Sequence, residues 1–527
     1  MTIVDYFEIV NDLKKGKSDG GMGLASDHII YGTPKLAQML TKLFNTMIIH
    51  GVGPEDMCTG TMVPIPKGKR ADICNSDNYR GICLQSQLCK LLDMFMLRRE
   101  APSLITSDLQ FGFKAKMSAT MATTVVTETV DYYLSQEGNV YGLALDASKA
   151  FDRVEYGKLF KMLLDRNFNI VYMRLLLNMY INQKMRVRFN DVYSDYFTVG
   201  NGVKQGGVIS PTLFTCYVDG MLQKLKDSKL GCNVGSHYIG CVSYADDLML
   251  LAPTLSSLNG MIDICESYAA EYKIKFNGTK SKLMFFTKGH NVCQPNIYVS
   301  GEPVENVTSL KYLGHMLHSD RNNSHVGYIR KEFIVKFNSF MGDFYELSSE
   351  IKNNLFQKYC MCFYGSQLAN LASPEINTIL AEWRKAVRRI LGVPPRTHSN
   401  LLYHVVGSPP LDVILHQRFI KYFYAGYTSH NVIVRDIFKG AVYLPTQMGN
   451  NLRHVLNKIH MGVNCVDICT PQHINNALLE MWMCSCIESD IRVAFHINEV
   501  ICMRDTHETS ILNRAECFAI INCLCTS

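Results

Sequence analysis

The sequence lacks the segments that would anchor a protein in a membrane or send it into the secretory pathway. Its 527 residues contain no apolar run of about 18 residues, the length needed to cross a bilayer. The amino-terminal residues, MTIVDYFEIVNDLKKGKS, do not place basic charges before an apolar stretch as a signal peptide does. We therefore expect an intracellular protein of the cytoplasm or nucleus, without a membrane partner.

A strong excess of one charge sign is also missing. The 53 Lys and Arg residues against 47 Asp and Glu residues leave a formal charge of +6, which permits an anionic partner without requiring one. With 47% hydrophobic and 19% charged residues, the composition excludes a disordered tail. The 19 cysteines are odd in number and scattered over a long chain, which favours reduced thiols over a disulfide framework.

Internal repeats and low-complexity segments are absent, and helix and strand signals follow one order through the middle of the chain. That order is strand, helix, strand pair, helix, strand, the plan of a split β-α-β ferredoxin-like sheet backed by helices. From about residue 326 the pattern stays helical. The expected elements are strands at 141–147, 281–286 and 309–317, hairpins at 185–200 and around 246–247, and helices at 156–166, 210–227 and 255–276.

Three aspartates interrupt apolar, strand-like runs. Asp146 follows GLAL, and Asp246 and Asp247 separate VSYA from LMLLA. An unpaired buried carboxylate is costly and would neutralise. Three carboxylates at adjacent strand ends could instead hold two Mg²⁺ ions roughly 3.5–4 Å apart, which suits in-line phosphoryl displacement. The alternative is that the acidic pair forms an ordinary hairpin turn, where aspartate is common.

The motifs around these acids resemble one protein family. YADD at 244–247 resembles the signature of reverse transcriptases, and LDASKAFDRV at 145–154 resembles the first catalytic block of their non-LTR (LINE-type) retrotransposon branch. The remaining blocks are similar to that branch in the same order along the chain. They are VPIPKGK (63–69), NYRGICL (78–84), QFGF with Ser118 (from 110), GVKQGGVISPTLF (202–214), NGTKSK (277–282) and SLKYLGHML (309–317).

The resemblance implies an α+β fold of the right-hand polymerase type. Such a fold has fingers, a ferredoxin-like palm and a helical thumb, here followed by a mostly helical C-terminal region. The expected division is an N-terminal helical extension of the fingers over 1–60, fingers over 61–140, palm over 141–320 with part of the fingers inserted at about 165–200, thumb over 321–400, and a C-terminal region of unknown role over 401–527.

The resemblance also implies an RNA-directed DNA polymerase that extends a DNA primer on an RNA template with dNTPs, using two Mg²⁺ ions or Mn²⁺. Asp146 and Asp246 would coordinate both ions, with Asp247 as a supporting acid. Phe151 falls where the family has an aromatic ring under the sugar, which leaves no room for a 2′-hydroxyl. The alternative for Phe151 is a core residue at a strand–helix junction.

Five further residues match positions that bind the nucleotide in this family. Lys67 and Arg80 match fingers cations that grip the triphosphate, and arginine can bind phosphate in a fork. Gln205 and Gly206 lie in a loop whose glycines let the backbone approach nucleotide and template. Lys280 matches a lysine that donates a proton to the leaving pyrophosphate. For each cation the alternative is a solvated surface charge.

The segment WRKAVRRILG at 383–392 predicts an amphipathic helix in the thumb. Its basic side would follow the backbone of a nucleic-acid duplex, or be an ordinary solvated face. That side consists of Arg384, Lys385, Arg388 and Arg389. Near the C-terminus, Cys484, Cys486, His496 and Cys502 have zinc-ligand chemistry, but their CxC spacing is tighter than the usual CxxC, so we assign no zinc site.

The sequence opens just upstream of the fingers motifs, so we expect a polymerase module separated from the endonuclease of a complete element. Two alternatives follow from this. One is a catalytically silent or domesticated nucleic-acid-binding remnant, and the other is an RNA-binding protein like a group II intron maturase. Retention of all three palm aspartates favours the enzyme, because decayed copies would lose costly acids early.

Overall fold

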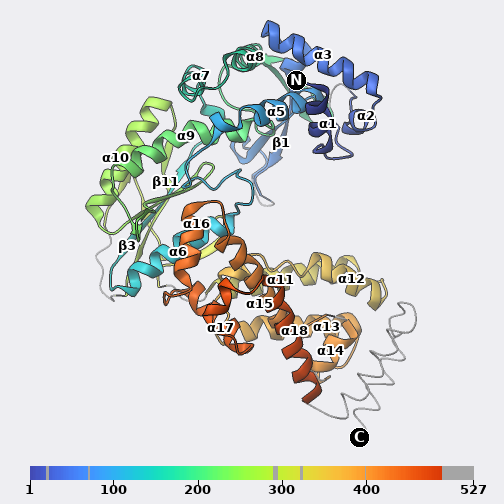
Figure 1. The fold of residues 1–527 in the computed structure, drawn as a ribbon, viewed down its shortest axis with the longest axis vertical. Coiled ribbons are helices and arrows are strands. Elements are labelled where there is room, and N and C mark those ends of the chain that lie inside the picture. The colour runs from blue at the N-terminus through green and yellow to red at the C-terminus, as the bar shows by residue number, and fades with distance from the viewer. Residues whose placement is uncertain are drawn as a thin grey trace.

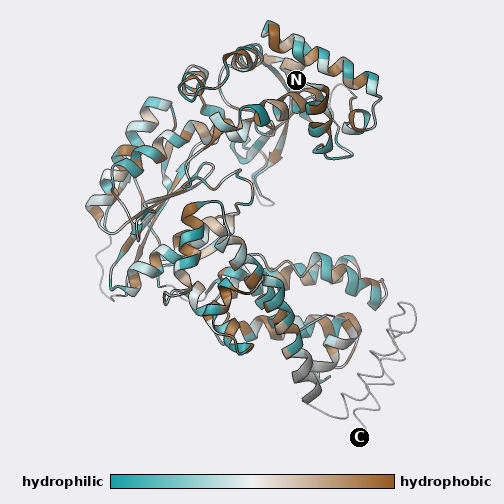
Figure 2. Cartoon of the chain, viewed as in Figure 1, coloured by the Kyte–Doolittle hydropathy of each residue, from teal (hydrophilic) through white to brown (hydrophobic). Residues whose placement is uncertain are grey.

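The computed structural model describes residues 1–18, 23–68, 72–288, 295–320, 324–397, 399–406 and 408–488. The chain forms an arc that runs from the N-terminal helices, through a central sheet, to a helical C-terminal part (Figure 1). Hydrophilic and hydrophobic residues alternate along most helices (Figure 2). Within the described residues, no helix is both long and apolar enough to cross a membrane.

The helices of the N-terminal part of the chain share one hydrophobic core. Phe44, Leu91 and Phe214 are among its fully buried side chains. Thr33 caps the long helix α3, whose first residue is a proline that suits this position. The helices are α1 (Ile3–Asn11), α2 (Ser26–Ile30), α3 (Pro34–His50), α4 (Glu55–Cys58), α5 (Gln87–Arg99), α7 (Tyr156–Asp165) and α8 (Ile170–Ile181).

The first sheet has the order β2-β1-β4-β5, with β6 also paired to β4. The strands β1 and β2 are antiparallel, and β4 runs parallel to β1. The sequence analysis missed β1 and β2, because prolines and glycine interrupt their alternation. The strands are β1 (Thr59–Pro66), β2 (Tyr79–Leu84), β4 (Lys184–Phe189), β5 (Val192–Tyr193) and β6 (Phe197–Thr198).

The second sheet confirms the expected ferredoxin-like palm. Its order β11-β3-β10-β9, extended by β14 at the β11 edge, places the first and third strands of the motif in the middle, and these three neighbouring pairs are antiparallel. Helices α9 and α10 lie along the sheet (Figure 1). The elements are β3 (Val140–Ala147), α9 (Ser210–Asp227), β7 (Asn233–Val234), β8 (His237–Tyr238), β9 (Cys241–Tyr244), β10 (Asp247–Ala252), α10 (Leu255–Tyr272), β11 (Phe276–Phe286), β12 (Tyr298–Val299), β13 (Glu302–Pro303) and β14 (Glu305–Asn306).

The single strand expected at 309–317 was wrong, because this segment is a tight hairpin. Its strands are β15 (Ser309–Tyr312) and β16 (His315–His318). Leu313 and Gly314 at the turn both have positive φ angles, as the turns favoured in two-residue hairpins require. A leucine gives little sequence signal for such a turn. The expected hairpin at 185–200 is present, but β4 pairs with both β5 and β6.

The helical part from residue 324 is confirmed, and its core is continuous with that of the palm. Its helices pack back onto helix α6 (Ala119–Ser135), which itself contacts the palm strands β3 and β9. Buried aromatic side chains such as Trp383 and Phe423 fill the interior. The helices are α11 (Ser324–Asp343), α12 (Ser349–Tyr359), α13 (Ile376–Leu391), α14 (Ser399–Val406), α15 (Leu411–Tyr427), α16 (Val432–Ala441), α17 (Gln447–Lys458) and α18 (Pro471–Glu488).

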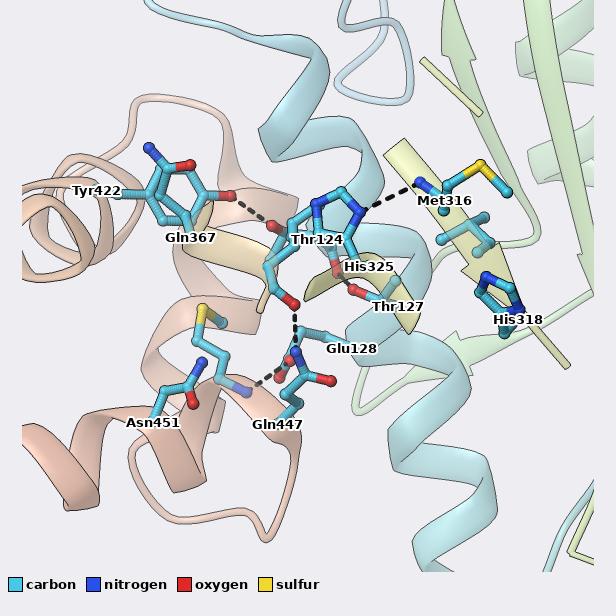
Figure 3. A pocket seen from close by; sticks show the side chains of 13 residues that line it. Thr124, Thr127, Glu128, Met316, His318, His325, Gln367, Tyr422, Gln447 and Asn451 are labelled. Carbon is cyan, nitrogen blue, oxygen red and sulfur yellow. Dashed lines mark hydrogen bonds between the residues drawn. The ribbon is translucent and has the colours of Figure 1, made fainter. Parts of the chain in front are cut away.

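Carboxylates from α6 and from the segment before it cap two of these helices from outside. Glu128 accepts a hydrogen bond from the backbone N–H of Met448 at 3.0 Å, at the start of α17 (Figure 3). Asp108 accepts from the N–H of Val432 at 3.3 Å, at the start of α16. Helix N-termini carry free N–H groups and partial positive charge, so carboxylates stabilise them. The C-terminal helices are therefore fixed to the palm by specific polar contacts.

A buried carboxylate in α5 makes stability depend on pH. Asp93 is 6% exposed and accepts hydrogen bonds from the backbone N–H groups of Val208 and Ile209. Burial raises the pKa of Asp93 to about 6, partly offset by Lys204. The folded protein thus holds this proton more tightly than the unfolded chain, so the free energy of unfolding falls as the pH rises from about 4 through 6.

We expect Asp93→Asn to remove this pH dependence. Between pH 4.5 and pH 8, the wild type should lose on the order of 2–3 kcal/mol of unfolding free energy that the variant does not lose. Urea unfolding at both pH values measures it, with the exposed Asp165→Asn as the matched control. An unchanged pH profile in Asp93→Asn would show that Asp93 is ionised in the folded protein as readily as in the unfolded chain.

Candidate active site

The fold brings the three aspartates to one end of the palm sheet. Leu145 of β3 pairs with Leu248 of β10, so one step further along the register Asp247 comes opposite Asp146. Residues opposite each other on antiparallel strands point to the same face. Asp246 lies in the two-residue turn, since Tyr244 of β9 pairs directly with Asp247. The acids are therefore neighbours in space, although about a hundred residues separate them in the chain.

The carboxylates influence one another electrostatically. Burial raises the pKa of Asp247 to about 6, and the charges of Asp246 and Asp146 add to the rise. The pKa of Asp246 is raised by burial and then by Asp146, while Arg80 opposes the rise. Both residues are nevertheless exposed on one side, so water reduces the effect of burial and the repulsion between the carboxylates remains. Protons or cations at this site relieve that repulsion.

Lys280 lies beside the end of β3 because β11 bulges there. The register of β11 against β3 shifts between Asn277 and Lys282. Buried Ser281 joins the bulge to the acidic strand, since its Oγ accepts from the Asp146 N–H at 3.1 Å and donates to the Asn277 carbonyl at 2.7 Å. The bulge leaves Lys280 exposed next to the acids.

The fingers present cations toward the same place. Arg80 is the exposed second residue of β2 and pairs with Ile65 of β1. Its charge opposes the rise in the pKa of Asp246. Lys67 follows β1, and its Nζ donates to the Asp77 carbonyl oxygen at 2.8 Å. Of these two cations, Arg80 is thus close enough to the palm acids to act on Asp246, whereas Lys67 lies beside Asp77.

Two residues at this junction were missed by the sequence analysis. The Nζ of Lys149 forms an ion pair with the Asp77 carboxylate at 2.8 Å, which links palm to fingers. Lys149 holds the pKa of Asp77 below its usual value, with smaller effects from Lys67 and Lys280. Asp77 thus marks where three lysines converge. Neither residue stands out in the sequence, because surface Lys and Asp carry no local signal.

Gln205 and Gly206 lie against the free edge of β2. The Gln205 carbonyl accepts from the Cys83 N–H at 2.6 Å, and its Nε2 donates to Asp152 at 3.2 Å. Gly206 has a φ of +114°, and an added Cβ would lie 2.7 Å from the Cys83 carbonyl oxygen. Only glycine fits this conformation and this contact. The loop is therefore held beside the strand that carries Arg80.

Phe151 is held between two other rings. It is partly buried and stacks on Phe214 of α9, with ring centroids 4.5 Å apart and an interplanar angle of 15°. Phe113 meets it edge-on at 6.3 Å. The backbone carbonyl of Phe151 accepts from the Val203 N–H at 2.9 Å. The ring is thus fixed in place a few residues after β3, the strand that carries Asp146. This position is compatible with both predicted roles, contact with the sugar and packing at the strand–helix junction.

The basic side of α13 is divided into bound and exposed residues. Arg384 donates to the Tyr403 hydroxyl at 3.2 Å, and Arg388 donates to the Thr397 carbonyl at 2.8 Å, so both are partly buried. Lys385 and Arg389 are exposed. Trp383, Val387 and Ile390 are buried, which confirms the amphipathic pattern. The exposed pair also makes contacts within the chain, since Lys385 forms an ion pair with Glu382 at 3.2 Å and Arg389 donates to Asn338 at 3.1 Å.

The acids have the donor chemistry of a magnesium site. Among the residues that the structure describes, no three acidic, histidine or cysteine side chains already converge closely enough to hold a metal ion. Asp146 is nonetheless near enough to raise the pKa of Asp246 and of Asp247, and carboxylate oxygens are the donors that Mg²⁺ prefers. The side chains of Cys484 and Cys486, and residues His496 and Cys502, lie outside the described part of the chain.

Comparison with known proteins gives one family match. Residues 65–317 match the family described as reverse transcriptase (RNA-dependent DNA polymerase). The chain is 25% identical over 420 residues to the RNA-directed DNA polymerase from mobile element jockey of Drosophila funebris, covering 75% of this chain and 44% of the relative. It is 25% identical over 232 residues to the Pol polyprotein from the type-1 retrotransposable element R2 of Nasonia vitripennis, covering 44% and 22%.

The chain therefore spans less than half the length of these two relatives. A solved structure of apo telomerase from Candida tropicalis is also similar, with 12% identity, a TM-score of 0.38, and coverage of 85% of this chain and 74% of that one.

Proposed function

Because residues 65–317 are a reverse transcriptase domain related to the RNA-directed DNA polymerases of non-LTR retrotransposons, we propose that this chain extends a DNA primer on an RNA template with dNTPs. The observation that carries the proposal is the opposition of two charge clusters. Acids gather at one end of the palm sheet, where Arg80 acts on the pKa of Asp246, while Lys67 and Lys280 both act on the pKa of Asp77. An incoming nucleoside triphosphate needs both kinds of group.

Two Mg²⁺ ions, or Mn²⁺, would be held by Asp146 and Asp246, with Asp247 as a supporting acid. When bound, such ions neutralise phosphate charge and activate the primer 3′-hydroxyl. The support for this assignment is the donor chemistry and the mutual repulsion of the three carboxylates.

The remaining roles are divided between orientation and charge. Arg80 and Lys67 would bind the triphosphate, which aligns the α-phosphate for in-line attack. Lys280 would donate a proton to the leaving pyrophosphate. Phe151 would lie beneath the sugar, and the loop of Gln205 and Gly206 would support nucleotide and template.

We further propose the polymerase division already expected from the motifs. The N-terminal extension covers 1–60, the fingers 61–140 with an insertion at about 165–200, the palm 141–320, the thumb 321–400, and a helical C-terminal region 401–527. In the thumb, Lys385 and Arg389 would contact duplex phosphates, because they are exposed while Arg384 and Arg388 are partly buried. Contacts of this kind weaken as salt is raised.

Primer extension tests the proposal. The purified chain, a DNA primer annealed to an RNA template, Mg²⁺ and dNTPs should give a full-length product, and chelation with EDTA should abolish it. A matched DNA template measures how far RNA is preferred. A folded chain that binds the primer–template but adds no nucleotide would contradict the proposal and favour the RNA-binding alternative.

A further inference from the structure

The turn that carries Asp246 has an unusual backbone. Ala245, the residue before Asp246, has a φ of +58° and is only 7% exposed. Alanine rarely adopts this left-handed conformation without help from its surroundings. The backbone N–H and carbonyl of a buried residue must also find hydrogen-bond partners. Something outside the turn must therefore hold Ala245 in place.

Gln110 supplies that support. Its side chain is fully buried, and its Oε1 accepts hydrogen bonds from the N–H groups of Ala245 at 2.9 Å and Gly112 at 2.8 Å. Its Nε2 donates to the hydroxyl of Ser243 at 2.9 Å. The Ser243 hydroxyl in turn donates to the Ala245 carbonyl at 3.2 Å. Both polar backbone groups of Ala245 thus end on one buried side-chain network.

The backbone around Gln110 is fitted to the same turn. The Phe111 N–H donates to the Ser243 carbonyl at 2.8 Å, and the Ser243 N–H donates to the Leu109 carbonyl at 2.9 Å. This short segment therefore extends the palm sheet beyond β9. A Cβ added to Gly112 would lie 2.4 Å from the Ala245 backbone nitrogen. Gln110 supplies the hydrogen bonds to the turn, and the missing side chain of Gly112 leaves room for the Ala245 backbone.

We propose that Gln110 is a positioning residue for the acids, acting through Ser243 and Ala245. By fixing the backbone immediately before Asp246, the network sets the direction of that carboxylate relative to Asp146. This inference rests on the proposed function, because the carboxylates need a fixed geometry only if they hold ions and substrate. A glutamine that merely filled the core would affect folding without changing how the acids bind cations.

Three variants separate these two roles. Gln110→Ala removes three of the four hydrogen bonds of the network, Ser243→Ala removes the two made by the Ser243 hydroxyl, and Ser243→Thr keeps the hydroxyl. Gln87→Ala is the matched control, because Gln87 is also a buried glutamine, 1% exposed, and its Nε2 donates to the Lys17 carbonyl at 3.3 Å in the fingers. If Gln110→Ala does not fold, the pair of Ser243 variants still tests the network.

The first measurement is primer extension across a Mg²⁺ titration. We expect Gln110→Ala to lower kcat by about 10–100-fold and to raise the half-saturating Mg²⁺ concentration several-fold. The KM for dNTP should change by less than about threefold, since the fingers cations are untouched. Ser243→Ala should show a smaller loss that Ser243→Thr restores. Gln87→Ala should keep the wild-type Mg²⁺ dependence.

The second measurement is Mn²⁺ binding followed by electron paramagnetic resonance, which does not require activity. Gln110→Ala should bind Mn²⁺ more weakly than both the wild type and Gln87→Ala. Equal Mn²⁺ binding and equal Mg²⁺ dependence in folded Gln110→Ala would overturn the inference, as would the same loss in Gln87→Ala. A wild type that binds Mn²⁺ but extends no primer would instead overturn the proposed function.

Discussion

Replacing Asp246 with asparagine is expected to abolish primer extension while making the folded protein more stable. We expect kcat to fall by about a thousandfold or more, which equals about 4 kcal/mol of activation free energy. Charge stabilisation of this size is what a ligand of a catalytic ion contributes. Removing one of three mutually repelling carboxylates should raise the melting temperature at pH 8, because Asp146 raises the pKa of Asp246 in the folded protein.

The expected changes in activity and in melting temperature have opposite signs. A substitution that damages folding lowers both activity and melting temperature, whereas this one should lower only the first. Extension assays and thermal melts of wild type and Asp246→Asn, with exposed Asp165→Asn as control, measure both quantities. Added Mg²⁺ should raise the melting temperature of the wild type more than that of the variant. An active Asp246→Asn would remove this residue from the proposed site.

The position of the acids could be read from the sequence because it conflicts with the hydrophobic pattern. A charge at a strand end beside GLAL or VSYA is visible as a break, and the ferredoxin-like order of elements places both breaks at one edge. The fold of the palm followed from the same alternation. Its prediction succeeded where the buried face of each strand is continuous, as at Leu143 and Leu250.

The missed features depend on tertiary contacts rather than on local pattern. The tight turn at Leu313 needs a left-handed backbone that no sequence rule assigns to leucine. The pairing of Asp77 with Lys149 joins residues 72 positions apart. Gln110 lies in the QFGF motif, but the motif does not indicate that its side chain binds the backbone of Ala245, 135 residues further along the chain.

The net charge of the chain is small, although positive and negative side chains are clustered separately around the candidate site. Three acids gather at the end of the palm sheet and three lysines converge on Asp77, so these charges cancel one another in the total of +6. Arg80 opposes the rise in the pKa of Asp246, so a cation of β2 acts on the palm acids. A triphosphate with its cations fits between such clusters because each of its charges finds a partner.

Truncating Phe151 to alanine is expected to weaken discrimination between dNTPs and rNTPs by on the order of a hundredfold. The ring stacks on Phe214, which is 1% exposed in α9, and its own carbonyl is bound to Val203. A ring fixed in this way cannot move aside for a 2′-hydroxyl, so removing it should admit ribonucleotides. The partly buried ring should also contribute about 1–3 kcal/mol to stability, less than a fully buried one.

The ratio of kcat/KM for dNTP to that for the matching rNTP measures this effect and is unaffected by a loss of folded protein, because both substrates meet the same preparation. Phe151→Tyr keeps the ring and should keep the wild-type ratio. Phe113→Ala removes the neighbouring ring that touches Phe151 edge-on, and it should also leave the ratio nearly unchanged. If Phe151→Ala lowers stability but preserves the ratio, Phe151 is a packing residue at the strand–helix junction, and sugar selection must come from elsewhere in the site.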